Sequence, residues 1–211
     1  MKLKIELKLM LLLSIFYMVG LLGILIPEYR FYFLGLSPFN LLLTLALFSM
    51  ANREFDRMFV LLFCIICIVG FFVEVLGVAT GAIFGVYHYG EALGMQGLNV
   101  PFIIGVNWYL LAMSTYEAFH YKRIHKLMRA MLSAALMTFI DVLIEPLSAK
   151  LDFWYWSENI APLQNYIAWF VIAFLFQLII QQFRPQVNKT AAIFVIALQI
   201  IFFISLHLFL K

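Results

Sequence analysis

The chain has 211 residues, of which 65% are hydrophobic, and its mean hydropathy is +1.02. A soluble domain is only about 45–50% apolar, so the composition predicts an integral membrane protein and excludes an ordinary soluble enzyme. The formal net charge is only +3, so nucleic acid is not expected as a partner.

Seven apolar runs are long enough to cross a bilayer, because a transmembrane helix needs about 20 residues. The sequence has no low-complexity linker and no soluble domain. We therefore expect an all-α fold, a polytopic membrane bundle of about seven transmembrane helices, with residues 1–211 forming a single integral membrane domain. The predicted spans are approximately Leu7–Ile26, Phe31–Ala51, Met58–Ala79, Pro101–Phe119, Ala130–Leu147, Asn165–Phe183 and Ala191–Leu210.

The first two runs each carry an irregular feature. The first follows three lysines, like a signal peptide, but it is long and has no clear small-x-small cleavage site before Pro27. We expect it to be retained as the first span. The second run is interrupted by Ser37 and Pro38, which makes it the least regular of the seven.

The basic residues are divided unevenly between the two sides of the predicted bundle. With a cytoplasmic N-terminus, the outside segments carry only Arg30, Lys150 and Lys211 of the fourteen lysines and arginines. The positive-inside rule therefore predicts that the N-terminus is cytoplasmic. The two longest connections, residues 80–100 and 148–164, then lie together on the outer side. The inside segments carry Lys2, Lys4, Lys8, Arg53, Arg57, Lys122, Arg123, Lys126, Arg129, Arg184 and Lys189.

The third span contains a carboxyl group, Glu74, near its outer end. A charged side chain at the centre of a span costs about 2.5–3.5 kcal/mol on insertion scales, so Glu74 is expected to be functional or paired. Together with Glu74, the glycines Gly70, Gly77 and Gly81 form one helical face at spacings of four, three and four residues. Glycines beside the acid would let a neighbouring helix or a flat apolar ligand come close.

Asp141 and Glu145 in the fifth span are four residues apart and therefore share a helix face. Pro146 follows at once, and because it lacks an N–H and disfavours helical geometry at Glu145, the helix should kink or end there. Two or three carboxyls in a low-dielectric site cannot all ionise cheaply, so at least one should be protonated near neutral pH. A neutral carboxylic acid in an apolar pocket can act as a proton donor.

Other polar and aromatic side chains are predicted at the same depth as the three carboxyls. Asn107 and Trp108 lie near the outer end of the fourth span, and Asn165 opens the sixth. The alternative to a functional site is a structural network, in which each carboxyl is hydrogen-bonded to a neighbouring Asn, Tyr or Trp. Trp154 and Trp156 are expected either as interfacial anchors or as rings that stack on a substrate.

Several kinds of chemistry are excluded by residues that the sequence lacks. Four histidines are too few for the clustered boxes of membrane di-iron oxygenases, so no metal site is predicted. No lysine lies deep in a predicted span, so a retinal Schiff base is not expected. No Gly-rich phosphate loop or nucleophile elbow is present. Cys64 and Cys67 lie inside an apolar helix and are expected to be packing residues.

The chemistry that these exclusions leave is acid catalysis on an apolar, lipid-soluble molecule. Protonation of an electron-rich alkene gives a tertiary carbocation, which needs an acid, aromatic faces that stabilise positive charge and a controlled water. Prenyltransferases share the Asp-x-x-x-Glu spacing and bind diphosphate through magnesium, but they need more carboxylates and basic partners. The sequence supplies buried acids, and aromatic residues make up 18% of it.

Two blocks of polar, glycine and aromatic residues carry a family resemblance. The first reads Glu74-x-x-Gly77-x-x-Thr80-Gly81-x-x-Phe84-Gly85-x-Tyr87-x-Tyr89, then Leu93-Gly94, Pro101 and Trp108. The second reads Asp141-x-x-x-Glu145-Pro146, Trp154-Tyr155-Trp156 and Asn165-x-x-x-Trp169. Over roughly residues 58–183, the sequence resembles the CruF-type carotenoid hydratases of the carotenoid biosynthesis family. The first two spans and the last match only in being hydrophobic.

The resemblance implies a carotenoid hydratase, a hydro-lyase that adds water to the terminal carbon–carbon double bond of an acyclic carotenoid end and gives a tertiary hydroxyl. It implies no redox cofactor. The implied partners are the acyclic carotenoid substrate, the lipid bilayer and other enzymes of the carotenoid pathway. The implied location is the cell membrane of a bacterium or archaeon, which the protein would cross several times.

We predict that Glu74, Asp141 and Glu145 are the catalytic residues. Our hypothesis is that Asp141 or Glu145 protonates the alkene, while Glu74 orients and deprotonates the water. The predicted substrate-binding residues are Thr80, Phe84, Tyr87, Tyr89, Asn107, Trp108, Trp154, Trp156, Asn165 and Trp169.

Two other functions fit the same residues. A carotenoid end cyclase would also begin by protonating an alkene, but it would exclude water from the cation, so its product would have the mass of the substrate. A non-catalytic carotenoid carrier or scaffold would bind unaltered pigment and tolerate replacement of the acids.

Overall fold

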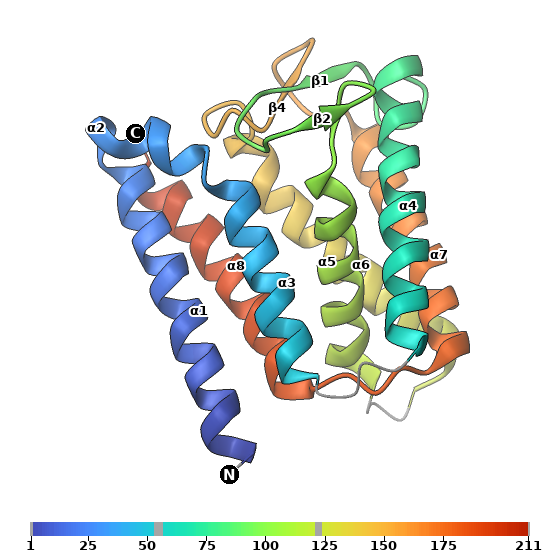
Figure 1. The fold of residues 1–211 in the computed structure, drawn as a ribbon. Helices are drawn as coiled ribbons and strands as arrows, with labels where there is room; N and C mark the ends of the chain where they lie inside the picture. The colour runs from blue at the N-terminus through green and yellow to red at the C-terminus, as the bar shows by residue number, and fades with distance from the viewer. Residues whose placement is uncertain (1, 53–56, 121–123, 211) are drawn as a thin grey trace.

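The computed structural model describes residues 2–52, 57–120 and 124–210, and the helices pack side by side in one bundle (Figure 1). Short strands gather at one end of it. The eight α-helices in these ranges are α1 (Lys2–Leu25), α2 (Pro27–Leu34), α3 (Ser37–Ala51), α4 (Arg57–Thr80), α5 (Ile103–His120), α6 (Lys126–Ile144), α7 (Leu163–Phe183) and α8 (Lys189–Phe209). A 3-10 turn, η1 (Glu145–Leu147), follows α6 directly.

Five helices in the described ranges are long and apolar enough to cross a membrane: α1, α4, α6 with η1, α7 and α8. The pair α2 and α3 gives a sixth candidate, which is bent by 58°. The chain is therefore a multi-pass membrane protein. Five or six of the seven predicted spans thus correspond to candidate membrane helices. The crossing over residues 101–119 and the cytoplasmic side of the N-terminus stay predictions.

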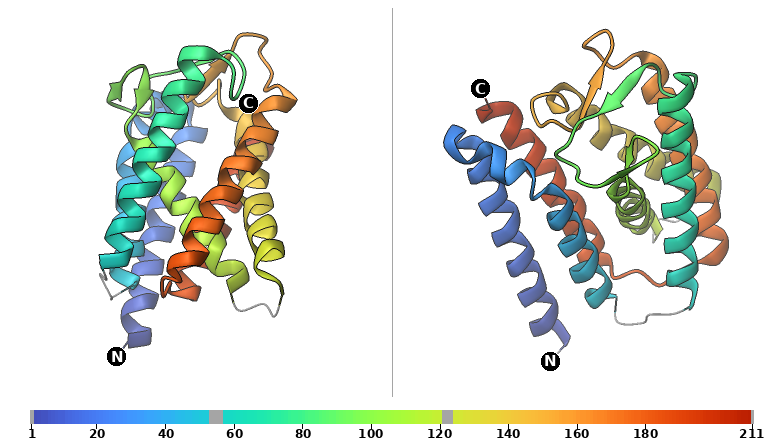
Figure 2. Two further views of the ribbon diagram at one scale, coloured as in Figure 1. Left: turned by 90° about the vertical axis from the view of Figure 1, so that its right-hand side faces the viewer. Right: turned by 45° about the horizontal axis from the view of Figure 1, so that its top comes forward.

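Helix α5, which corresponds to that fourth predicted span, lies in the middle of the bundle. It packs against α3, α4, α6, α7 and α8 (Figure 2), and every residue from Trp108 to Glu117 is buried. Gln177 of α7 donates its side-chain N–H to the Ala112 carbonyl at 2.9 Å and to the Thr115 hydroxyl at 3.1 Å. Because protein surrounds α5, the helix can carry polar groups that would be costly against lipid. The buried polar residues Ser114, Thr115 and Glu117 of α5 are therefore kept away from lipid.

Both interruptions that prolines predict are found. Helix α2 ends at Leu34, and α3 begins at Ser37 with Pro38 in its first turn, where the missing N–H breaks no helical hydrogen bond. Helix α6 ends at Ile144, and the chain continues through Glu145 as a 3-10 turn. The prediction that the fifth helix kinks or ends at Glu145 is confirmed.

Two glycines of α4 allow aromatic side chains to approach the helix closely. A Cβ atom on Gly70 would lie 2.9 Å from the Trp108 indole, and one on Gly77 would lie 2.5 Å from the Phe84 ring. The predicted close approach of a neighbouring helix is confirmed at Gly70, because Trp108 belongs to α5, whereas the neighbour of Gly77 lies in the connection that follows α4. Gly81 acts differently, because it ends the helix with a φ of +65° and donates its N–H to the Gly77 carbonyl at 2.8 Å.

Gly105 brings α5 against the backbone of α4, and its replacement by alanine should destabilise the bundle. The new Cβ would lie 2.6 Å from the Cys67 carbonyl oxygen, which cannot rotate away. We expect G105A to lower the free energy of unfolding by about 1–3 kcal/mol, measured as a lower thermal midpoint in detergent. Gly20→Ala is the control, because nothing lies within 4 Å of its Cβ and alanine favours helix. Equal midpoints would contradict the prediction.

The two long connections lie at the same end of the bundle, where they pair with each other. Strand β1 (Tyr87–Tyr89) of the first connection is antiparallel to β4 (Trp154–Trp156) of the second. A smaller pair, β2 (Gln96–Gly97) and β3 (Val100–Pro101), lies within the first connection. The chain termini lie at opposite ends of the bundle (Figure 1). Helices thus form the body of the molecule, and the strands cover one end.

Candidate active site

Three carboxyl groups from neighbouring elements line one small cavity next to the paired strands. Glu74 comes from α4, Asp141 from α6 and Glu145 from η1, and their exposed fractions are 3%, 1% and 7%. The cavity has a volume of about 30 Å³. A water molecule needs roughly 10–15 Å³ of such space, so one or two waters fit. The lining residues are Glu74, Phe84, Tyr87, Tyr89, Ile104, Asn107, Trp108, Asp141, Ile144, Glu145, Trp154, Trp156, Asn165 and Trp169.

This cavity brings together the three predicted catalytic residues and all of the predicted binding residues except Thr80. Thr80 is exposed at the end of α4, where its hydroxyl donates to the Leu76 carbonyl at 2.6 Å and accepts the Ala82 N–H at 3.1 Å. Ile104 and Ile144 also line the cavity and were not predicted. An isoleucine in an apolar helix gives no sequence signal that separates a cavity wall from ordinary packing.

Glu74 accepts hydrogen bonds from three neutral donors. The Tyr87 and Tyr89 hydroxyls donate to Oε2 at 2.5 and 2.9 Å, and the Trp108 indole N–H donates to Oε1 at 3.1 Å. Hydrogen bonds of this kind stabilise the ionised form of a carboxylate. Glu74 is therefore not exposed to lipid but held inside the protein by aromatic side chains of α5 and β1.

Tyr87 and Tyr89 act as neutral donors in this arrangement. Burial raises the pKa of both phenols above the ordinary value, and the negative charge of Glu74 raises it further. A phenol hydroxyl can also rotate and accept a hydrogen bond. The two tyrosines can therefore serve Glu74 either as a carboxylate or as a carboxylic acid.

Asp141 and Glu145 share one amide but differ in their other partners. The Asn165 side-chain N–H group donates to Asp141 Oδ2 at 3.0 Å and to Glu145 Oε1 at 2.9 Å. The indoles of Trp154 and Trp156 donate to Glu145 Oε2 at 3.1 and 2.7 Å. Within the described residues, Asp141 Oδ1 is buried with no hydrogen-bond partner. Asp141 is therefore the carboxyl with the least support for a negative charge.

Strand geometry explains why the aromatic residues alternate in the two connections. Tyr87 pairs with Trp156, and in both β1 and β4 the first and third residues line the cavity. The middle residues, His88 and Tyr155, pair with each other and stack with ring centroids 5.3 Å apart. Successive side chains of a strand point to opposite faces, so one face supplies the cavity and the other lies outside it.

Asp152 ties the two connections together beside the strands. Its Oδ2 accepts the backbone N–H groups of Glu91 and Ala92 at 3.0 and 3.1 Å, and its Oδ1 accepts the Tyr155 hydroxyl at 2.8 Å. The backbone of Asp152 has a φ of +54°. These bonds hold the first connection against the second and so help to place the aromatic residues next to the carboxyls.

Aromatic faces form much of the remaining wall. The Trp108 and Trp169 rings stack with centroids 4.0 Å apart and an interplanar angle of 16°, and the centroids of Tyr87 and Trp156 are 5.0 Å apart. None of the lining residues in the described part of the chain is a lysine or arginine. Positive charge that develops in this cavity would meet carboxylates and ring faces.

Replacing Glu145 with glutamine should destabilise the site. The three donors that face Glu145 are two indole N–H groups, which can only donate, and the Asn165 amide, which is shared with Asp141. A glutamine NH₂ would have to face one set of donors, so we expect a loss of about 1–3 kcal/mol in the free energy of unfolding. Thermal unfolding in detergent measures it, with exposed Glu158→Gln as control. An unchanged midpoint for E145Q would argue against the assigned contacts.

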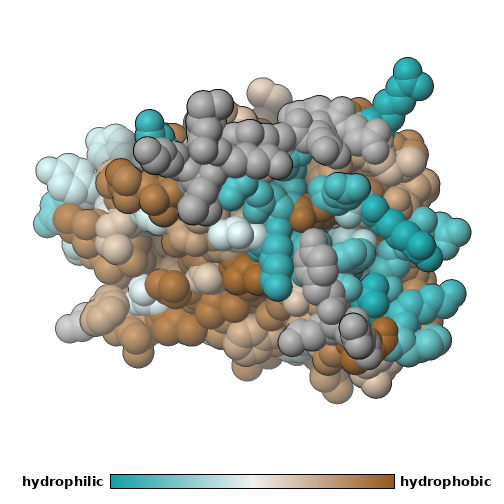
Figure 3. Space-filling model, turned by 90° about the horizontal axis from the view of Figure 1, so that it is seen from below, coloured by the Kyte–Doolittle hydropathy of each residue, from teal (hydrophilic) through white to brown (hydrophobic). Residues whose placement is uncertain are grey.

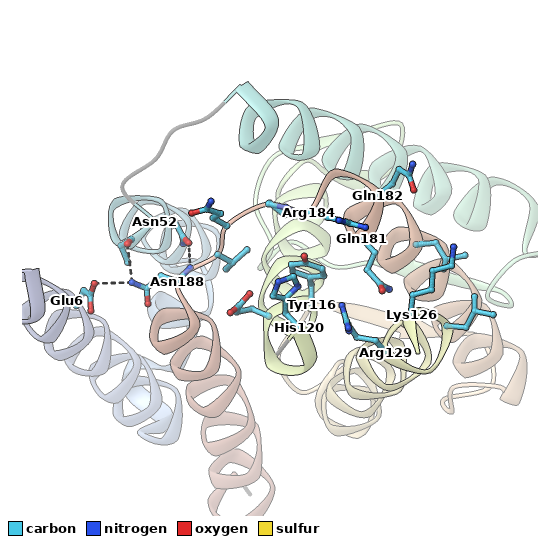
Figure 4. A pocket seen from close by; sticks show the side chains of 17 residues that line it. Glu6, Asn52, Tyr116, His120, Lys126, Arg129, Gln181, Gln182, Arg184 and Asn188 are labelled. Carbon is cyan, nitrogen blue, oxygen red and sulfur yellow. Dashed lines mark hydrogen bonds between the residues drawn. The ribbon is translucent and has the colours of Figure 1, made fainter. Parts of the chain in front are cut away.

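A larger recess of about 1010 Å³ lies at the other end of the bundle, where hydrophilic side chains gather (Figure 3). Lys126, Arg129 and Arg184 line it (Figure 4). Glu117 also belongs to its lining. Basic residues at this end match the side that the charge pattern predicts to be cytoplasmic. The three carboxyls predicted to be catalytic line the small cavity and not this recess, so volume alone does not identify the site.

The side chains around the small cavity are not arranged as a metal-binding site. Among the described residues, no group of three or more His, Cys, Asp or Glu side chains is arranged to hold a metal ion. The cavity carboxyls instead bind indole, phenol and amide donors. No metal ligands are assigned.

One comparison with known proteins gives a match. The model of a family described as "Carotenoid biosynthesis protein" matches residues 35–210. No curated protein and no solved structure matches the chain. The matched range includes α3 to α8 and every residue that lines the small cavity.

Proposed function

We propose a specific reaction for this chain, which belongs to the carotenoid biosynthesis protein family and therefore has a role in carotenoid biosynthesis. In our proposal it is a cofactor-independent hydratase of the CruF type, which adds water to the terminal double bond of an acyclic carotenoid end. The product carries a tertiary hydroxyl. The observation that carries the proposal is the single cavity, walled by aromatic rings, that holds three buried carboxyls and has room for a water.

Asp141 is the proton donor in this mechanism. Glu74 and Glu145 each accept three hydrogen bonds, whereas Asp141 accepts only the shared Asn165 amide within the described structure. The proton therefore resides most stably on Asp141. An O–H on Oδ1 would have no protein acceptor among the described residues and would be available to an alkene.

Glu74 is the base that takes a proton from water. When Glu74 accepts that proton, the Tyr87 or Tyr89 hydroxyl can rotate to accept a hydrogen bond from the new carboxylic acid. Glu145 lacks this freedom, because the N–H groups of Trp154 and Trp156 can only donate. Glu145 instead remains a carboxylate that stabilises positive charge on the substrate.

The reaction balances without an oxidant or reductant. The Asp141 proton forms the new C–H bond at the less substituted alkene carbon, and the electron pair of the double bond leaves a tertiary carbocation. Water forms the C–O bond to that carbon and loses a proton to Glu74. Return of this proton to Asp141 restores the starting state, so the net change is the addition of one water.

The space for water favours hydration over the closest alternatives. A cyclase must keep water away from the cation, and a carrier or scaffold needs no buried acid without a hydrogen-bond partner. Here the cavity of about 30 Å³ lies directly among the three carboxyls. We therefore propose hydration in preference to cyclisation or simple pigment binding.

Expression in a host that makes an acyclic carotenoid such as lycopene tests the proposal. The pigments are separated by chromatography and identified by mass spectrometry, with a host carrying the D141N variant as control. A product that gains the mass of one water per reacted end supports hydration. A product of unchanged mass with a new ring would indicate a cyclase, and unchanged pigment would contradict both enzymatic functions.

A further inference from the structure

A second cavity, which no sequence motif indicated, adjoins the carboxyl cavity. It has a volume of about 90 Å³ and shares the residues Ile104, Asn107, Ile144 and Trp154 with the carboxyl cavity. We call it the end-group cavity. Its lining residues are Tyr17, Ile24, Ser37, Asn40, Leu41, Leu93, Ile104, Asn107, Ile144, Phe153, Trp154, Gln199, Phe202 and Phe203.

The walls of the end-group cavity suit a branched hydrocarbon. Most of its lining is aliphatic or aromatic, including Phe153, Phe202 and Phe203. Of its polar groups, the Tyr17 hydroxyl is already hydrogen-bonded with Thr44 and Gln199. No carboxyl group lines it. Within the described structure, Asn40 Oδ1 is a buried polar atom of this lining without a hydrogen-bond partner, and an apolar ligand would otherwise meet mostly hydrocarbon.

Trp154 lies at the boundary between the two cavities and lines both of them. Its indole N–H donates to Glu145 Oε2 at 3.1 Å on the acid side, while its ring also lines the end-group cavity. The Asn107 amide lines both cavities as well. A double bond held at this boundary would have carboxyls and water on one side and apolar walls on the other.

The volumes limit what the two cavities can hold. An apolar cavity of about 150 Å³ takes up benzene, so about 90 Å³ accommodates a small branched group but not a six-membered ring with methyl substituents. The carboxyl cavity has room for water alone. Neither cavity can hold the conjugated chain of a carotenoid, which must lie outside both.

We propose that the end-group cavity between α1, α3 and α8 binds the terminal dimethyl-alkene unit of the carotenoid and presents its double bond to the carboxyls across the boundary formed by Ile104, Asn107, Ile144 and Trp154. The inference rests on the proposed function and adds its substrate pocket. It also gives a role to α1, whose Tyr17 and Ile24 lie outside the family match at residues 35–210. The size of the cavity selects an acyclic end over a ring-closed one.

Neighbouring leucines on α3 provide a matched pair of variants. Leu41 lines the end-group cavity, whereas Leu42 is 47% exposed on the outer surface of the bundle. We expect L41W to fill the cavity and weaken binding of an acyclic carotenoid about 10–200-fold, the range in which apolar pockets discriminate. L42W should bind as the wild type does. Binding is measured as pigment retained by purified protein in the D141N background, and hydration is measured with Asp141 intact.

A double variant shows whether a loss comes from the filled cavity or from misfolding. Phe203 also lines the end-group cavity, so F203A should restore the space that L41W removes. The double variant L41W/F203A should recover pigment binding, which a misfolded protein would not. A carotenoid with two ring-closed ends should compete at least tenfold more weakly than lycopene for the D141N protein, as the low end of pocket discrimination implies.

The outcomes separate this inference from the proposed function. Binding and hydration by L41W at the wild-type level would overturn the end-group cavity and leave the hydratase proposal intact. Equal competition by ring-closed and acyclic carotenoids would overturn it too. If lycopene binds, L41W abolishes binding and F203A rescues it, but no hydrated product forms, the cavity stands and the hydratase proposal fails.

Discussion

Replacement of Asp141 with asparagine should abolish most hydration while leaving the fold intact. A positioned general acid contributes about 10²–10⁴-fold to a rate, so we expect at least a 100-fold fall in product formation. The amide fits the site, because its oxygen can accept the Asn165 N–H in place of Oδ2 while its NH₂ group occupies the position of Oδ1, which has no donor facing it in the described structure. The variant removes the transferable proton and little else.

The measurement is the amount of hydrated carotenoid formed per amount of membrane protein, together with thermal unfolding in detergent. Exposed Glu158→Gln is the matched control, because it also converts a carboxyl to an amide but lies in the second connection away from the cavity. A D141N protein that hydrates at the wild-type rate would remove Asp141 from the mechanism. A large loss of stability would mean that Asp141 has a structural role, as in the network alternative.

The long helices could be predicted from hydropathy because lipid offers no other partner for the backbone N–H and C=O groups. The third predicted span, Met58–Ala79, differs from α4 by a single residue at each end. Pro38 and Pro146 marked the interruptions, since proline restricts the residue before it and lacks an N–H. Helix α5 is not among the candidate membrane helices, and its buried polar residues are surrounded by protein.

The strands at the end of the bundle were not predicted. Each has at most three residues, too few for a periodic pattern, and the partner of β1 is contributed by the other long connection. Tyr87, Tyr89, Trp154 and Trp156 were predicted to bind substrate, but the pairing of the two segments that carry them was not predicted. Pairing of β1 with β4 is what turns these residues toward the carboxyls.

The members of the site could be expected from their depth, but their partners could not. A sequence does not specify which face of α4 lies toward α6, so the convergence of Glu74 with Asp141 and Glu145 needed the folded chain. The bridging amide of Asn165 and the two indoles on Glu145 depend on side-chain directions from three separate elements. The roles of these residues in catalysis stay predictions.

Two replacements of Glu74 separate a catalytic from a structural role, because one should preserve the stability of the protein and the other should lower it. In E74Q, the amide oxygen can accept the Trp108 N–H, and the NH₂ group can donate to the Tyr87 and Tyr89 hydroxyls, which rotate to accept. In E74A, the Trp108 N–H is left buried without an acceptor, at a cost of about 1–3 kcal/mol. E74Q should therefore unfold at nearly the wild-type temperature, and E74A well below it.

Activity should not follow this order. Both variants lack the base that takes a proton from water, so both should hydrate at least about 100-fold more slowly than the wild type, the lower limit for a general base. The stable E74Q protein should still bind lycopene, since the end-group cavity does not include Glu74. Product analysis, pigment retention and thermal unfolding on the same preparations distinguish the roles. An active E74Q beside an unstable E74A would make Glu74 a structural acceptor, and the water base would have to be another group.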